Sequence, residues 1–193
     1  MANIDDSSKT KLEEDRYFAE RDREILEQHK QAESLRVERA TIADIVGTND
    51  ESILVELQDL GFNPETAKLL ALLPLVQVAW AEGHVTDRER EIILDLARSR
   101  GVEPESEAHA RIVAWITVRP RDEMFVRGIG IIGRILAARP EHASSVVMQD
   151  LIQQCTRVAA ASGGFLGLTD KVSSAEEAII ARIASVLDKA KAE

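Results

Sequence analysis

The fold of this chain is decided by the stretch LLPLVQVAWAEGHVTDREREIILDLA, which occupies residues 72–97. Apolar residues fill its first part and recur every three or four positions in its second part, a spacing typical of helices. Between the two parts, Glu82-Gly83 interrupts the apolar run. Thr86 followed by Glu89 is the pattern of a capping box, which begins a helix. The stretch therefore predicts two helices joined by a tight turn.

A second stretch, residues 158–180, repeats this order of features. It has an apolar helix end, a glycine turn, an apolar anchor, a Ser173-x-x-Glu176 cap and a second helix. It also carries seven extra residues, Gly164 to Asp170. Such a pseudo-repeat predicts one bundle built from two related halves, about residues 64–118 and 122–190.

The remaining sequence is also helical in pattern, and no segment alternates apolar and polar residues as a strand would. We therefore expect an all-α fold, a compact helical bundle with a charged helix at its amino end. Residues 1–40 are expected to form a charged helical extension with a disordered beginning, and residues 41–193 the main domain. Within the extension, the apolar residues form a narrow stripe of helical spacing: Phe18, Ile25, Leu26 and Ala32.

The charge is negative and unevenly distributed. The chain has 24 basic and 34 acidic residues, a formal net charge of -10. Residues 41–120 hold 14 acids and 7 bases, whereas residues 121–193 hold 9 of each. An acidic surface repels phosphate groups, so we expect no nucleic-acid partner. The half that contains the first turn is expected to be the working face.

The compartment predicted from the sequence is the cytoplasm. Cys155 is the single cysteine, which excludes an intramolecular disulfide framework and fits a reducing environment. The amino terminus MANIDDSSKT lacks the features of a secretory signal. The apolar run Leu69 to Ala81 spans 13 residues, fewer than the roughly 20 that a membrane-spanning helix needs.

The first turn allows two interpretations. Carboxylates before, within and after a glycine turn can converge on a hard cation such as Ca²⁺, which prefers several oxygen ligands. The candidate ligands are Glu82, Asp87 and Glu89. The capping box alone accounts for Thr86 and Glu89, because a first-turn acid also suits the helix dipole. Glu82 lies outside that explanation, so both interpretations stay open.

The stretch at residues 72–97 resembles the core motif of the TerB-like, tellurite-resistance-associated proteins: Ala-Asp-Gly, an apolar residue, Ser/Thr, two variable residues and Glu. With its second copy, the resemblance covers roughly residues 64–190. It implies an all-helical fold of two similar halves and an acidic cluster that binds divalent cations such as calcium. It also implies a non-enzymatic stress-response role in protein complexes near the membrane.

Carried over residue by residue, the resemblance implies metal ligands at Glu82, which replaces the motif Asp, and at Glu89. In the second copy Ser162 replaces the acid while Glu176 is retained, and Asp170 on the inserted loop could substitute for the lost acid. No nucleotide cofactor is expected. Protein partners, including a second copy of the chain, are expected.

Other motifs indicate packing roles and not catalytic, cofactor-binding or zinc-binding roles. Gly128–Gly133 matches G-x-G-x-x-G but lacks the strand that dinucleotide binding requires, so its glycines are expected to admit a neighbouring helix. The loop Gly163–Leu168 could fold onto the core or contact a partner. Cys155, Trp80 and Trp115 are expected in the core, and the four histidines show no zinc-ligand spacing.

Three classes of function follow. The first is a TerB-like stress-response and interaction module that binds a divalent cation. The second is a metal-independent structural adaptor that acts through its amino-terminal helix and its helical surfaces. The third, an enzyme, has no cluster of acid, base and nucleophile to support it, and we expect the chain not to be one.

Overall fold

The computed structural model describes the backbone of residues 4–162 and 172–189 and the side chains of residues 16–161 and 172–189. All of its regular elements are helices, so the predicted all-α fold class is confirmed. In chain order they are α1 (Ile4–Val46), α2 (Glu51–Asp59), the 3₁₀ helix η1 (Ala67–Leu72), α3 (Leu73–Ala79), α4 (Asp87–Ser99), α5 (Glu107–Thr117), α6 (Asp122–Ala137), α7 (Glu141–Ser162) and α8 (Ser174–Lys189).

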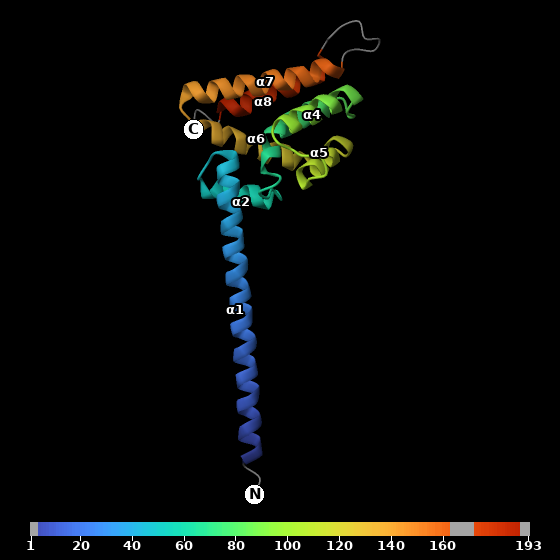
Figure 1. Cartoon of the computed structure of the whole chain (residues 1–193). Helices are drawn as coiled ribbons and strands as arrows, with labels where there is room; N and C mark the ends of the chain where they lie inside the picture. The colour runs from blue at the N-terminus through green and yellow to red at the C-terminus, as the bar shows by residue number, and fades with distance from the viewer. Residues whose placement is uncertain (1–3, 163–171, 190–193) are drawn as a thin grey trace.

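Helix α1 is 43 residues long and projects as a single rod from a compact body that contains the other helices (Figure 1). It continues without a break through the domain boundary expected at residue 41. Its last turn enters the body, where Ile42 and Ala43 are buried. It ends at Gly47, whose positive φ of 75° lets the N–H groups of Gly47 and Thr48 both bond to the carbonyl of Ala43.

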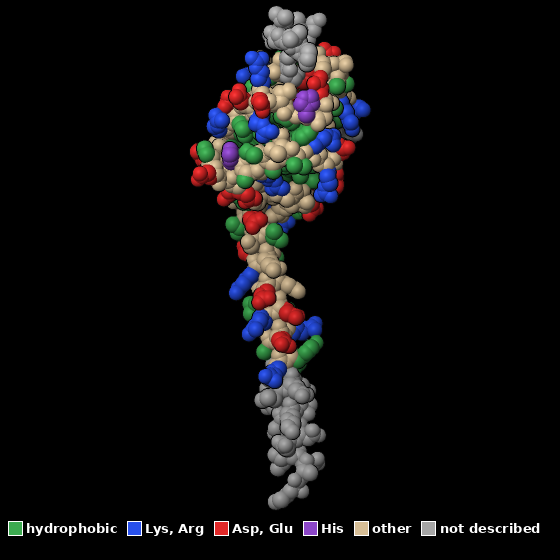
Figure 2. Space-filling model, turned by 90° about the vertical axis from the view of Figure 1, so that its right-hand side faces the viewer, with side chains coloured by type: hydrophobic (Ala, Val, Ile, Leu, Met, Phe, Trp, Pro, Cys, Tyr) green, Lys and Arg blue, Asp and Glu red, His purple; other side chains and the backbone are tan. Residues whose placement is uncertain are grey.

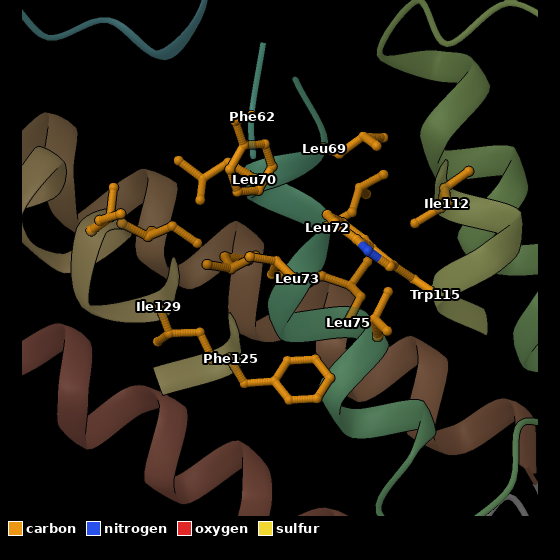
Figure 3. Packing of buried hydrophobic residues seen from close by; sticks show 14 of the residues in the cluster. Phe62, Leu69, Leu70, Leu72, Leu73, Leu75, Ile112, Trp115, Phe125 and Ile129 are labelled. Atoms are coloured by element: carbon orange, nitrogen blue, oxygen red, sulfur yellow. The ribbon is translucent and has the colours of Figure 1, made fainter. Parts of the chain in front are cut away.

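The body is built around η1 and α3. Their side chains Leu69, Leu72, Leu73, Leu75 and Val76 are fully buried. Figure 3 shows Leu72 and Leu75 on the side of Ile112 and Trp115 of α5, with Leu73 turned toward α6. The 3₁₀ helix and α3 contact α1, α4, α5, α6, α7 and α8. This segment therefore lies at the centre of the helical contacts of the body.

The sequence predicts one helix from Asn63 to Leu73, and this prediction is wrong over its first part. Residues 64–66 form turns because Asn63 and Thr66 exchange side-chain hydrogen bonds with each other's backbone N–H groups, at 3.0 and 2.9 Å. The 3₁₀ helix then leads into α3, in which Pro74 occupies the first turn, where its missing N–H costs little.

The two pseudo-repeated helix pairs, α3–α4 and α7–α8, pack against each other. Helix α7 contacts both α3 and α4, and α8 contacts α3. The helix starts predicted from the capping boxes at Thr86 and Ser173 agree with α4 and α8, which begin one residue later. The Gly-rich loop Gly163–Leu168 lies outside the described residues. Among the described helices, none is both long and apolar enough to cross a membrane.

The glycine motif of α6 lies in the middle of that helix, and one of its glycines allows a close approach. A Cβ at Gly128 would lie 2.4 Å from Leu73 Cδ1, which is closer than real Cβ contacts allow. At Gly130 a Cβ would meet nothing within 4 Å. Packing of α6 on η1 and α3 therefore depends on Gly128, as expected for a motif that admits a neighbouring helix.

This difference gives a matched pair of substitutions. Gly128→Ala should lower the free energy of unfolding by about 1–3 kcal/mol, because Leu73 must move in a packed core. Gly130→Ala should leave stability unchanged or raise it by up to about 1 kcal/mol, since alanine is the better helix former. Urea denaturation of both variants measures the difference. Equal effects of the two substitutions would contradict the packing assigned to Gly128.

Candidate functional site

The acidic turn predicted from the sequence contains a complete capping box. The Glu89 carboxylate accepts hydrogen bonds from the backbone N–H and the hydroxyl of Thr86, both at 2.7 Å. In return, the Glu89 N–H donates to the Thr86 hydroxyl oxygen at 3.3 Å. These bonds satisfy donors at the start of α4, as the capping interpretation requires.

The second copy has the same geometry at the start of α8. The Ser173 N–H donates to the Glu176 carboxylate at 2.7 Å, and the Glu176 N–H donates to the Ser173 hydroxyl at 3.3 Å. Both glutamates are buried, with exposed fractions of 2% for Glu89 and 1% for Glu176. The pseudo-repeat read from the sequence therefore extends to the hydrogen bonds of its two caps.

The buried Glu89 is also close to other carboxylates. Burial raises the pKa of its carboxyl above the ordinary value of 4.5, and the hydrogen bonds from Thr86 lower it in part. The carboxylates of Glu176 and Glu82 raise the pKa further through Coulomb repulsion. The fold thus brings two other predicted metal ligands, Glu82 and Glu176, into electrostatic reach of Glu89.

The other predicted ligands are placed differently. Asp87 lies in the first turn of α4 with an exposed side chain, and Glu82 is exposed as well. Asp170 and the side chain of Ser162 lie outside the described residues. Within the described part of the chain, no three His, Cys, Asp or Glu side chains are grouped as a metal site. Metal binding at this turn stays a prediction.

A second candidate surface runs along α1. From residue 16 to residue 37 every side chain is exposed, including the stripe of Phe18, Ile25, Leu26 and Ala32. Phe18 and Leu26 have exposed fractions of 59% and 60%, high values for large apolar side chains. Figure 2 shows apolar side chains, in green, between charged ones along the described part of the rod.

The root of α1 contains a feature that the sequence did not reveal. A hollow of about 250 Å³ lies between α1 and the beginning of α2, lined by Arg36, Arg39, Ala40 and Ala43 of α1 and by Leu54 of α2. The ion pair between Arg39 and Glu51, at 2.8 Å, forms one of its walls. No local sequence signal predicts this hollow, because it arises where α2 turns back along α1.

The cysteine and the two tryptophans, to which the sequence assigns no catalytic role, contribute to the packing of the body. Cys155 is fully buried, and burial raises the pKa of its thiol to about 12, so the thiol is not a nucleophile near neutral pH. Trp115 is buried, and its carbonyl accepts a hydrogen bond from the indole N–H of Trp80 at 2.8 Å. Both tryptophans thereby connect the acidic turn to α5.

Comparison of the chain with protein-family models, with curated proteins and with solved structures gave no match.

The raised pKa of Glu89 predicts a pH dependence of stability. A carboxyl whose pKa is higher in the folded state stabilises the fold below its unfolded pKa, and that contribution is lost as the pH rises through the folded pKa. Glu89→Gln keeps a capping oxygen and carries no charge. The free energy of unfolding of the wild type, relative to this variant, should therefore fall as the pH rises above the ordinary carboxyl pKa of 4.5.

Urea denaturation at a series of pH values, with a chelator present, measures the effect. Asp87→Asn is the matched control, because it removes an exposed carboxylate from the same helical turn. A difference between wild type and Glu89→Gln that stays constant with pH would contradict the assignment.

Proposed function

We propose that this chain is a non-enzymatic interaction module that assembles with another protein helix through the exposed stripe of α1. In this proposal the body serves as a folded anchor and α1 as the docking element. The proposal corresponds to the structural adaptor considered from the sequence. The observation that carries it is the length of α1 that extends beyond the body with its apolar side chains exposed.

The physical argument concerns helix stability. An isolated helix is marginal in water, and most helical stability in proteins comes from packing an apolar face. Residues 16–37 of α1 have an apolar stripe, but the body covers only the end of the helix. A helical pattern longer than about 25 residues suggests a coiled coil or a related assembly. A partner helix would supply the packing that this stripe lacks.

The proposal includes a non-enzymatic role in the cytoplasm. The non-enzymatic role is supported by the acidic turn, where the Glu89 carboxylate caps α4. The buried, weakly acidic thiol of Cys155 agrees with it. A free cysteine in the core also suits a reducing compartment.

The test removes the stripe while leaving the body intact. Phe18→Gln/Ile25→Gln should weaken association with the partner by a factor of about 10 or more, because each apolar side chain buried in a complex contributes about 1.5–3 kcal/mol. The melting of the body should not change, since both residues are exposed. Sedimentation velocity and affinity capture of the full-length wild type and variant, followed by mass spectrometry, measure the association.

The control variant is Glu20→Gln/Glu27→Gln, which changes two exposed residues on the opposite side of α1. A wild type that binds neither a second copy nor another protein would contradict the proposed function. So would a partner that is retained equally by the stripe variant and the control.

The second candidate function is a TerB-like stress-response module that binds a divalent cation and joins a complex near the membrane. The observation that favours it is the proximity of the Glu82 and Glu176 carboxylates to Glu89. A cation beside Glu89 would offset the repulsion that Glu82 and Glu176 each exert on its carboxylate. In this alternative the cation would replace the Thr86 hydrogen bonds to Glu89 or share that carboxylate with them.

Calorimetric titration with Ca²⁺ distinguishes the two functions. Under the second function, the wild type should bind Ca²⁺ and gain thermal stability, and Glu82→Gln/Glu89→Gln should lose both effects. Asp95→Asn, which alters an exposed acid on the same helix α4, should behave as the wild type. Negligible and identical heats for the wild type and the double variant would contradict Ca²⁺ binding at this turn.

A further inference from the structure

The exposed part of α1 has a seam whose charges are arranged for a partner with the same sequence. Phe18, Asp22, Ile25, His29, Ala32 and Arg36 follow one another at alternating spacings of four and three residues, the repeat of a coiled-coil seam. All six side chains are exposed. We define these six residues as the α1 seam.

We propose that two copies of the chain pair through the α1 seam in antiparallel orientation, with the two-fold axis in the turn from His29 to Ala32. This inference rests on the proposed function, because it names the partner of the same helix. The partner is a second copy, and the pairing is isologous, so that every contact occurs twice.

The charges of the seam decide the orientation. In a parallel, in-register pair, Asp22 would meet Asp22 of the second copy and Arg36 would meet Arg36, which places like charges together at both levels. In the antiparallel pair, Asp22 lies opposite the turn from Arg36 to Arg39, so opposite charges meet twice. The side chain of Arg36 is free for this role, since its ion pair with Glu33 is long, at 3.8 Å, and both groups are largely exposed.

The shape of the helix root fits the same arrangement. Phe18 of one copy lies opposite the turn from Ala40 to Ala43 of the other, where the hollow between α1 and α2 opens. The exposed Ala40 leaves room for a phenyl ring at this hollow, which the almost fully buried Ala43 and Leu54 also line. Arg36, which also lines this hollow, can stack on the ring as a cation–π partner.

The net charge of the chain favours the same orientation. Residues 16–36 carry five acidic and five basic side chains, so two such segments do not repel each other through net charge. The whole chain carries -10. An antiparallel pair separates the two bodies by about 35–40 Å along the helix axis, several times the Debye length of about 8 Å at physiological salt. A parallel pair would place the two acidic bodies side by side.

Charge reversal in the full-length chain tests the proposal. Sedimentation equilibrium at low salt should show a dimer for the wild type. Asp22→Arg and Arg36→Asp should each weaken the dimer about tenfold or more, since each replaces two attractive pairs with two repulsive ones. The double variant Asp22→Arg/Arg36→Asp restores both pairs with their signs exchanged and should return the dissociation constant to within about threefold of the wild type.

Glu20→Arg is the matched control for Asp22→Arg. It makes the same change of net charge on the opposite side of α1 and should leave the dimer intact. Circular dichroism of every variant establishes that the body remains folded. A dimer that tolerates both single reversals, or that the double variant fails to restore, would overturn the antiparallel pairing. A monomeric wild type that captures a different protein through the stripe would overturn self-pairing alone and leave the proposed function in place.

Discussion

Complete burial of the η1–α3 segment is the constraint on which the rest of this structure depends. Leucines at positions 69, 72, 73 and 75 have no exposed surface, and α1, α4, α5, α6, α7 and α8 contact the segment that contains them. Burying a leucine contributes about 1.5–3 kcal/mol, so this short segment carries a large share of the core. Helices α6 and α5 approach this segment closely. Gly128 of α6 makes room for Leu73, and the indole N–H of Trp80 donates to the carbonyl of Trp115 in α5.

The two buried capping glutamates are a structural feature that the two similar stretches of sequence share. Glu89 and Glu176 make equivalent hydrogen bonds at the starts of α4 and α8. In the first copy, Glu82 is a further acid within electrostatic reach of the capping residue Glu89. Capping explains the position of both glutamates, so a bound cation is an addition to this geometry and not a condition for the fold.

The fold class and most helix ends could be predicted because their signals are local. Capping residues, glycine stops and apolar spacing predict the start of α4 at Thr86 and the glycine packing of α6. The apolar spacing did not predict the turns at residues 64–66, where Asn63 and Thr66 exchange side-chain hydrogen bonds, or the 3₁₀ conformation of η1 that follows them. The carboxylate arrangement around Glu89 and the hollow at the root of α1 also escaped sequence analysis, because distant segments form both.

Helix α1 departs from the rest of the molecule because the apolar side chains of its residues 16–37 are not covered by the body. The central claim is that pairing with another helix supplies this missing contact. Hydrogen exchange of the backbone amides of residues 16–36, measured at about 1 µM and about 100 µM protein, tests it most directly. Self-pairing predicts protection that rises with protein concentration, while the body stays equally protected at both. Rapid exchange of these amides at both concentrations would contradict the claim for the isolated chain.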